Sequence, residues 1–340
     1  MPRGQALRAA IGAIVSLVAL FLVLRSVDLQ ATAEVLKSAD PRWILFAWLL
    51  IATDLALRGL RWQRLVRPIK AVPYLHMQAY LLIGYLMNNI LPARLGELVR
   101  SHYLGDREGV SRVSALGTVI VERIVDLVVC VTIASASLLI LSVRGVVASA
   151  VLVGIGVTGL FLVVLAIGIA AHRLPGADRI AGLIDRWPKI RELGRRVQDG
   201  LAVAGKPRTL VEALICSAGS WSASILAFAA IGQSIGLQLS IGQAALMTSG
   251  IALASAVPAG PSNLGTFEFA AVVIGQTIGI PSEQAFALAL IAHVSILLAT
   301  SVGGGIALIR IGWQRSATAP DPAPVRDRER TTSEAQSARS

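Results

Sequence analysis

The sequence predicts an all-α integral membrane protein, organised as an inverted-repeat helical bundle with about six full spans and two re-entrant hairpins. Hydrophobic residues make up 55% of the 340 residues and charged residues only 15%, whereas a soluble domain is about a quarter charged. Much of this apolar content lies in long windows without charge, and a similar proline-glycine turn occurs in each half of the chain. We therefore expect the helices to lie in a lipid bilayer.

Six segments are predicted to cross the membrane, because hydrocarbon about 30 Å thick requires about 20 apolar residues per helix. They are Ala9–Leu24, Trp43–Leu60, Val113–Val143, Gly145–His172, Ala213–Ile235 and Gln284–Ile309. No small-residue cleavage pattern follows the first segment, so we interpret it as an uncleaved span and not a signal peptide. Asp40 and Pro41 are typical of a helix start and support the beginning of the second span.

The distribution of positive charge predicts a re-entrant hairpin over residues 71–105. Of the 31 Lys and Arg residues, 26 lie in five segments that we expect in the cytoplasm together with both termini. These segments are 1–8, 58–70, 94–112, 173–208 and 310–340. Residues 71–93 then lie between two cytoplasmic segments and must return to the side they entered from. Asn88, Asn89, Pro92 and Gly96 weaken the helix where that turn is required.

A second hairpin is predicted over residues 241–281, entering from the opposite side. Its limbs, 241–257 and 267–280, are short for full spans, although charge parity alone also allows two short spans. The turns at 92–97 and 258–268 both contain Pro-Ala, a short insert, Leu-Gly and then Glu. Paired interruptions of this kind are typical of inverted-repeat transporters. We therefore divide the chain into repeats 1–145 and 146–312, followed by a disordered cytoplasmic tail at 313–340.

Ionised side chains within the predicted membrane segments are the first candidate functional residues, since each costs about 3 kcal/mol or more in lipid unless it has a partner or a role. They are Asp54, Arg94, Glu97, Glu122, Arg123, Asp126 and Glu268. Glu122 and Asp126 share one helix face and require an arginine between them, for which Arg94 or Arg100 is the expected source. A structural ion-pair network and a direct role in binding substrate or coupling ions are both open, and they are compatible.

The second turn is a candidate anion site. Ser262, Asn263, Gly265 and Thr266 precede the limb that begins at Phe267. The N-terminus of such a half-helix offers free N–H groups and a positive dipole end to a phosphate or carboxylate. A tight, well-capped bend is the alternative. Asn88 lies at the corresponding turn of the first half, and we include it among the candidate binding residues.

Two basic segments have a topological interpretation. Arg58, Arg61, Arg64 and Arg67 with Trp62 follow the second span, where interfacial arginines and tryptophan commonly contact anionic lipid. We expect these arginines to be mainly a topology signal. The loop 173–208 alternates basic and apolar residues, so an amphipathic helix on the membrane surface is expected there.

Other site classes have no support in the sequence. The histidines lack metal-ligand spacing, and ordinary packing is expected for them; they are His76, His102, His172 and His293. Cys130 and Cys216 lie in apolar stretches and predict neither a disulfide nor a zinc site. No nucleotide loop, nucleophile elbow or aromatic-basic nucleic-acid motif is present. We expect no metal, no cofactor and no nucleic-acid partner.

Several of these motifs together resemble the lysylphosphatidylglycerol synthase transmembrane-region family. The motifs are Arg61-Trp62, the Asn-x-x-x-Pro-Ala-Arg-x-Gly-Glu-x-x-Arg turn that ends at Arg100, Glu122-Arg123 with Asp126, and the segment 258–268. The resemblance spans roughly residues 8–312. It implies translocation of a modified phospholipid or related lipid between leaflets. Because neither an aminoacyl-transferase nor a nucleotide-sugar domain is recognisable, we expect no enzymatic activity.

Three functions are therefore considered. The first is a flippase-like transporter for an anionic, aminoacylated or polyprenyl-type lipid, located in a bacterial cytoplasmic membrane. The second is a lipid-modifying enzyme with Glu97, Glu122 or Asp126 as a general base. The third is a membrane scaffold for a separately encoded glycosyltransferase or aminoacyltransferase, with the loop 173–208 as its docking surface.

Overall fold

The computed structural model describes residues 3–91, 95–170, 200–255 and 260–318, and these form a bundle of α-helices without a β-strand. Five helices are long and apolar enough to span a membrane. They are α3 (Pro41–Val66), α6 (Arg112–Leu141), α7 (Val146–Ala170), α10 (Pro207–Ser234) and α13 (Ser282–Thr318). α1 (Arg3–Ser26) together with α2 (Leu29–Lys37) makes a sixth candidate span, bent by 86°. The predicted all-α membrane bundle with about six spans is confirmed.

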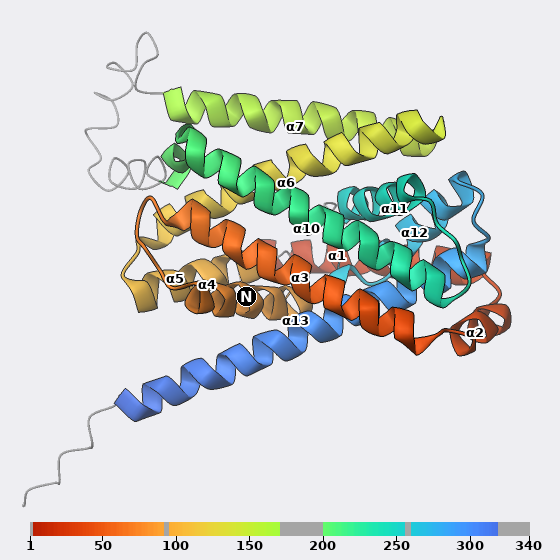
Figure 1. The fold of residues 1–340 in the computed structure, drawn as a ribbon, viewed down its shortest axis with the longest axis horizontal. Coiled ribbons are helices and arrows are strands. Elements are labelled where there is room, and N and C mark those ends of the chain that lie inside the picture. The colour runs from red at the N-terminus through yellow and green to blue at the C-terminus, as the bar shows by residue number, and fades with distance from the viewer. Residues whose placement is uncertain (1–2, 92–94, 171–199, 256–259, 319–340) are drawn as a thin grey trace, which may run out of the picture.

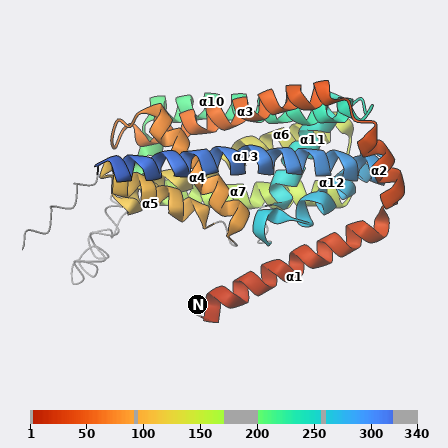
Figure 2. The ribbon, with the colours of Figure 1, turned by 90° about the horizontal axis from the view of Figure 1, so that it is seen from below.

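The helix α2 is an addition to the predicted elements. The side chain of Asp28 begins it, accepting hydrogen bonds from the backbone N–H groups of Gln30 and Ala31. Asp40 caps α3 in the same way through the N–H of Arg42, with Pro41 in the first turn, as predicted. α2 packs against α13 and closes one end of the bundle (Figure 2).

Four shorter helices form the two hairpins. α4 (Tyr74–Ile90) and α5 (Gly96–Glu108) form the first, and α11 (Ile241–Ala254) and α12 (Thr266–Thr277) form the second, which also includes the short η4 (Pro261–Asn263). At about 1.5 Å per residue, each of the four is shorter than the roughly 30 Å of a hydrocarbon core. α4 and α5 occupy one end of the bundle and α12 lies toward the other (Figure 2). The two helix pairs thus lie toward opposite ends of the bundle.

The packing of the helices has the two-fold pattern that an inverted repeat predicts. α3 lies along α10 at the centre (Figure 1). α4 packs against α13 as α11 packs against α6, and α5 packs against α6 as α12 packs against α13. Exchanging α3 with α10, α4 with α11, α5 with α12 and α6 with α13 therefore preserves these contacts. The first limb of each hairpin packs against the long helix of the other half, and the second limb against the long helix of its own half.

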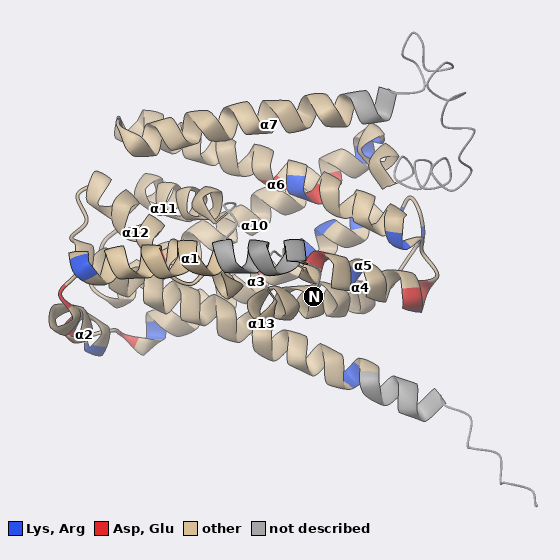
Figure 3. Cartoon of the chain, turned by 180° about the vertical axis from the view of Figure 1, so that it is seen from behind, with Lys and Arg blue, Asp and Glu red and all other residues tan. Residues whose placement is uncertain are grey.

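Positive side chains gather at one end of the bundle, here called the basic end (Figure 3). This end contains the connections between α3 and α4 and between α5 and α6, together with the start of α10. Its exposed or half-exposed basic residues include Arg64, Arg67, Lys70, Arg107, Arg112, Lys206 and Arg208. The opposite end has fewer, among them Lys37 and Arg144. The predicted topology depends on this difference in positive charge between the two ends.

Two helix boundaries differ from the prediction. α3 continues beyond Leu60 to Val66, so Arg58 and Arg61 lie inside a helix of the bundle and not in a connecting segment. α13 continues to Thr318, because its first proline after Pro281 is Pro320, and helix therefore replaces the first residues of the predicted tail. The predicted surface helix of the loop lies mostly outside the described residues, as do residues 319–340 and the candidate Arg94.

Two glycines allow the limbs of the first hairpin to approach closely. A Cβ atom on Gly96 would lie 1.9 Å from the carbonyl oxygen of Gly84, and the backbone N–H of Gly96 donates to Oδ1 of Asn88 at 2.8 Å. We expect Gly96→Ala to separate the limbs and to cost about 1–3 kcal/mol of stability, as overpacking generally does. Thermal unfolding in detergent checks this. Gly305→Ala, where a Cβ atom meets nothing within 4 Å, should leave the midpoint unchanged, and equal midpoints for the two variants would contradict the close packing.

Candidate functional site

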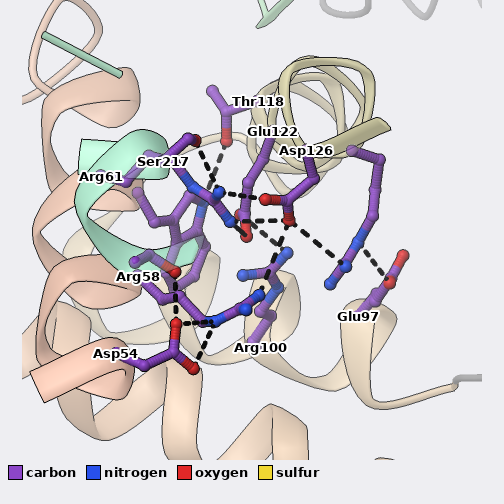
Figure 4. A network of polar contacts seen from close by, with 12 residues as sticks. Asp54, Arg58, Arg61, Glu97, Arg100, Thr118, Glu122, Asp126 and Ser217 are labelled. Carbon is purple, nitrogen blue, oxygen red and sulfur yellow. Dashed lines mark hydrogen bonds and ion pairs between the residues drawn. The ribbon is translucent and has the colours of Figure 1, made fainter. Parts of the chain in front are cut away.

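A network of buried ion pairs lies where α3, α5, α6 and α10 meet (Figure 4). Among the residues that the structure describes, it contains four arginines and four carboxylates, whose formal charges cancel. The arginines are Arg58, Arg61, Arg100 and Arg123, and the acids are Asp54, Glu97, Glu122 and Asp126. The sequence predicted all four acids and two of these arginines as candidates. It assigned the other two, Arg58 and Arg61, to a topology signal.

Arg61 is the arginine that separates Glu122 from Asp126. Its Nη2 lies 2.9 Å from both Oε1 of Glu122 and Oδ2 of Asp126, while its Nη1 donates to Oδ1 of Asp126 and to the Ser217 hydroxyl. The side chain is completely buried. The expected partner was Arg94 or Arg100, and Arg61 was not among the predicted partners. The sequence did contain an indication of this role, because Asp54, Arg58 and Arg61 are spaced so that they lie on one face of a helix.

Arg100 is also sealed from solvent, and it joins the first hairpin to α6. Its Nη2 lies 2.9 Å from Oε2 of Glu122, so this expected partner reaches Glu122, whereas Arg61 is the residue that bridges both carboxylates. The guanidinium stacks over the ring of Trp62 at 4.6 Å, and the indole N–H of Trp62 donates to Thr118. Trp62 is completely buried and therefore is not the interfacial residue that was expected. We refer to Arg61 and Arg100 as the sealed arginines.

Arg58 and Arg123 differ from the sealed arginines because their side chains are 17% and 32% exposed. We call them the cavity arginines. Nε of Arg58 lies 2.8 Å from Oδ1 of Asp54, and Nε of Arg123 lies 2.9 Å from Oε1 of Glu97. Each also has an Nη1 atom 3.8 Å from Oδ2 of Asp126. They are held in place by carboxylates yet remain open to a ligand.

Both cavity arginines line a central cavity of about 290 Å³. Its walls come from both repeats, with residues of α3, α4, α6, α10, α11, α12 and α13. The polar lining includes Asp54, Arg58, Asn88, Asn89 and Arg123, and the apolar lining includes Ile51, Phe228, Ile231, Ile251 and Phe267. Along α3, Ile51 lies nearer the opposite end than Arg58 does. The cavity is therefore amphipathic, and a charged group would bind on the side of the basic end.

The second turn is held by its own carboxylate. Oε2 of Glu268 accepts the N–H of Gly265 at 2.7 Å, and Oε1 lies 2.6 Å from Nδ1 of His293. The hydroxyl of Thr266 donates to the carbonyl of Asn263 at 2.9 Å. Glu268 thus occupies the helix N-terminus that was a candidate anion site. These contacts match the alternative prediction of a well-capped bend.

The two hairpin turns meet inside the bundle. The hydroxyl of Ser262 donates to the carbonyl oxygen of Asn89 at 2.9 Å. The side-chain amide of Asn89 in turn donates to the hydroxyls of Thr300 and Ser301 on α13. Ser262 and Asn263 have positive φ angles of 59° and 57°, a conformation that non-glycine residues adopt only when their surroundings hold them in it. Contacts between the repeats therefore define this turn.

Within the described residues, no three His, Cys, Asp or Glu side chains lie close enough together to hold a metal ion. The site consists of an ion-pair network, a cavity and two capped turns. Of the sequence candidates, Asp54, Asn88 and Arg123 line the cavity, Glu97, Arg100, Glu122 and Asp126 belong to the network, and the residues from Ser262 to Glu268 form the second turn.

Comparison with known protein families identifies the family of this chain. The model of the lysylphosphatidylglycerol synthase transmembrane region matches residues 9–304. The chain belongs to this family. The matched range includes the two hairpins, the ion-pair network and the cavity, so all of these features lie in the part that the family shares.

Two archaeal proteins illustrate the range of relatives of this lysylphosphatidylglycerol synthase transmembrane-region protein. Glycosyltransferase AglD of Haloferax volcanii is 23% identical over 94% of this chain, which covers 57% of that relative. A membrane protein of Methanothermobacter thermautotrophicus, designated UPF0104, is 34% identical over 33% of each chain. The chain therefore spans little more than half the length of the first relative. The alignment with the second relative covers a third of that protein.

Proposed function

We propose that this protein is a flippase-like transporter that moves an anionic, aminoacylated or polyprenyl-type lipid between leaflets. The observation that supports this most strongly is the amphipathic cavity between the two hairpin turns, with Arg58 and Arg123 at its polar side. The planar guanidinium group suits phosphate oxygens, to which it can donate two hydrogen bonds at once. A volume of about 290 Å³ holds a head group, and the acyl chains would remain in the bilayer.

The charge balance of the network favours a head group that contains a cation as well as a phosphate. Four arginines and four carboxylates already cancel, so a purely anionic ligand would bring an uncompensated charge to membrane depth, where it is costly. An aminoacylated head group offers an ammonium group to Asp54 while its phosphate contacts Arg58 or Arg123. We therefore rank aminoacylated lipids first among the three classes.

The proposed orientation follows from the charges. In this proposal the protein lies in the cytoplasmic membrane of a bacterium with the basic end in the cytoplasm, since cytoplasmic connections carry an excess of Lys and Arg. The first hairpin would then enter from the cytoplasm and the second from outside. Each leaflet would thus have one hairpin through which a head group reaches the cavity.

A second candidate function comes from the relative designated a glycosyltransferase, which aligns with 94% of this chain. It favours a protein that presents a lipid to a transferase, either on a separate chain or in a further domain. In our proposal this chain makes no covalent change to the lipid. Incubation of the purified protein with candidate donors, followed by mass spectrometry of the lipids, checks this: an altered lipid mass would support the enzyme alternative.

Reconstitution tests the transport proposal. We expect vesicles of phosphatidylcholine that contain the protein to expose acyl-labelled fluorescent lysylphosphatidylglycerol, alanylphosphatidylglycerol or phosphatidylglycerol from the inner leaflet to a membrane-impermeant quencher. Vesicles without protein should keep that fraction protected. Faster movement of alanylphosphatidylglycerol, whose single ammonium group balances its phosphate, would support the charge argument, whereas equal protection with and without protein for all three probes would contradict the proposed function.

A further inference from the structure

A buried histidine on α13 lies with both of its ring nitrogens against oxygen acceptors. Nδ1 of His293 is 2.6 Å from Oε1 of Glu268, and Nε2 is 2.9 Å from the carbonyl oxygen of Ser262. His293 is only 4% exposed and Glu268 only 3%. The ring of Phe267 stacks on the imidazole at 4.4 Å, and Phe267 also lines the central cavity. The histidine is therefore one aromatic ring away from the proposed lipid site.

These contacts fix the number of protons that the pair holds. A carbonyl oxygen only accepts hydrogen bonds, so Nε2 of His293 must carry a proton. Between Nδ1 and the carboxylate a second proton is required, either on the imidazole or on Glu268, because two lone pairs would otherwise face each other at 2.6 Å. The Glu268–His293 pair thus holds two protons and is neutral overall in the structure described.

Loss of one proton is incompatible with keeping both contacts. If the remaining proton is on Nε2, the lone pair of Nδ1 faces the Glu268 carboxylate. If it is on Nδ1, the lone pair of Nε2 faces the carbonyl of Ser262. One contact must therefore open, and a net negative charge remains in the apolar interior. Ser262 donates to Asn89 of the first hairpin, so the change reaches the contact between the two turns directly.

The helices that pack around the pair also carry other charged or titratable groups. α11 has no such residue and α12 has only Glu268. On α13, Glu283 is ten residues from His293, about 15 Å along a helix. The remaining charged or titratable groups on these helices are Arg3, Arg8 and Arg25 on α1, Glu34 and Lys37 on α2, Arg42, Asp54, Arg58, Arg61 and Arg64 on α3, His76 and three tyrosines on α4, Arg208, Glu212 and Cys216 on α10, and Arg310 and Arg315 on α13. Asp54 pairs with Arg58, and Arg208 with Glu212, so their charges are balanced locally.

We propose that the Glu268–His293 pair is a proton-binding site that couples lipid movement to proton movement. With the proton bound, the pair holds the second turn against the first, and with the proton released into water the contact between the turns opens. One proton is taken up and one released per cycle, and no other bond is made or broken. The inference rests on the proposed transport function and adds its coupling ion.

Nuclear magnetic resonance tests the proton count independently of transport. In protein labelled with ¹⁵N-histidine and ¹³C-glutamate and purified in detergent at neutral pH, we expect a proton on Nε2 of His293 and a second proton on either its Nδ1 or the Glu268 carboxyl group. The signal of His293 should be assigned by its loss in His293→Gln, or by elimination with the variants of the other three histidines if that variant does not fold. An Nε2 atom of His293 without a proton, or an Nδ1 atom without a proton beside an ionised Glu268 carboxylate, would overturn the proposal.

Transport in a pH gradient tests the coupling. For one proton per lipid, a gradient of one pH unit should shift the distribution of fluorescent lysylphosphatidylglycerol between leaflets by about tenfold. Glu268→Gln and His293→Gln should abolish this shift. His76→Gln is the matched control, because His76 forms an exposed pair with Glu108 at 2.9 Å, and it should retain the shift.

The outcomes separate the two proposals. Movement in the wild-type protein that does not respond to the gradient would overturn the coupling and leave the transport function standing. Absence of movement at every pH would overturn both. A shift that survives in Glu268→Gln and His293→Gln would assign the coupling to another group and overturn the role of this pair.

Discussion

Replacement of Arg61 by alanine is expected to unfold the bundle. The side chain is completely buried and is the shared partner of Glu122 and Asp126. Removing it leaves two carboxylates without their main counter-charge, and breaking a buried pair of this kind costs about 3–5 kcal/mol. That amount is comparable with the whole stability of many domains. We expect Arg61→Ala to yield little monodisperse protein and a strongly lowered midpoint of thermal unfolding in detergent.

Two further variants sharpen this prediction. Arg64→Ala is the matched control on the same helix, since its guanidinium is 34% exposed and lies 3.7 Å from Glu212; such a pair is worth about 1 kcal/mol or less. The double variant Arg61→Gln/Asp126→Asn removes one charge of each sign and should recover part of the lost stability. Equal midpoints for Arg61→Ala and Arg64→Ala would contradict the structural role of the sealed arginines.

Replacement of the cavity arginines should act mainly on transport and should cost less stability than Arg61→Ala, because both side chains are partly exposed. Arg58 and Arg123 keep part of their surface open toward the cavity, and a hydrogen bond from a charged donor is worth about 1.5–3 kcal/mol. We expect Arg58→Gln or Arg123→Gln to slow the movement of fluorescent lysylphosphatidylglycerol by roughly 10- to 100-fold. The measurement is the quenching assay in vesicles with matched amounts of folded protein.

The control for this experiment is Arg67→Gln. Arg67 directly follows α3 as its C-cap residue at the basic end and is exposed, so it shares the charge of Arg58 but does not line the cavity. Its variant should move lipid at the wild-type rate. If both cavity variants transported as fast as Arg67→Gln, the head group would have to bind elsewhere, and the cavity would lose its assigned role.

The sequence was sufficient to predict the membrane bundle and the two hairpins, because these features depend on properties that extend over many residues. Apolar windows of sufficient length define the spans, and the excess of Lys and Arg on one side required residues 71–105 to turn back. The paired Pro-Ala and Leu-Gly-Glu sequences located both turns. None of this requires knowledge of which side chains touch.

The partners within the ion-pair network could not be predicted in the same way. Arg58 and Arg61 follow the apolar part of α3, and a local window treats arginines in that position as the end of a span. Their place inside the bundle depends on Asp126 and Glu122 from α6 and Ser217 from α10, which are more than sixty residues away. Tertiary ion pairs allowed the helix to continue to Val66.

His293 shows the same limit. Its neighbours in the sequence are apolar, so a lone histidine there predicts ordinary packing. Its significance comes from Glu268 and Ser262 on another element. The sequence did contain Glu268 as a candidate, but it associated the turn with an external anion. In the structure the Glu268 carboxylate and the His293 imidazole form hydrogen bonds with the backbone of the turn.

The central claim is that the two hairpin turns meet inside the membrane beside a shared cavity. Cross-linking between Asn89→Cys and Ser262→Cys tests it most directly, in protein whose buried Cys130 and Cys216 have been replaced by alanine. The account predicts rapid joining by a short bis-thiol reagent, and no joining when Ser262→Cys is replaced by Ser142→Cys at the opposite end. Failure to join, with both cysteines open to a membrane-impermeant maleimide from opposite aqueous sides, would contradict it.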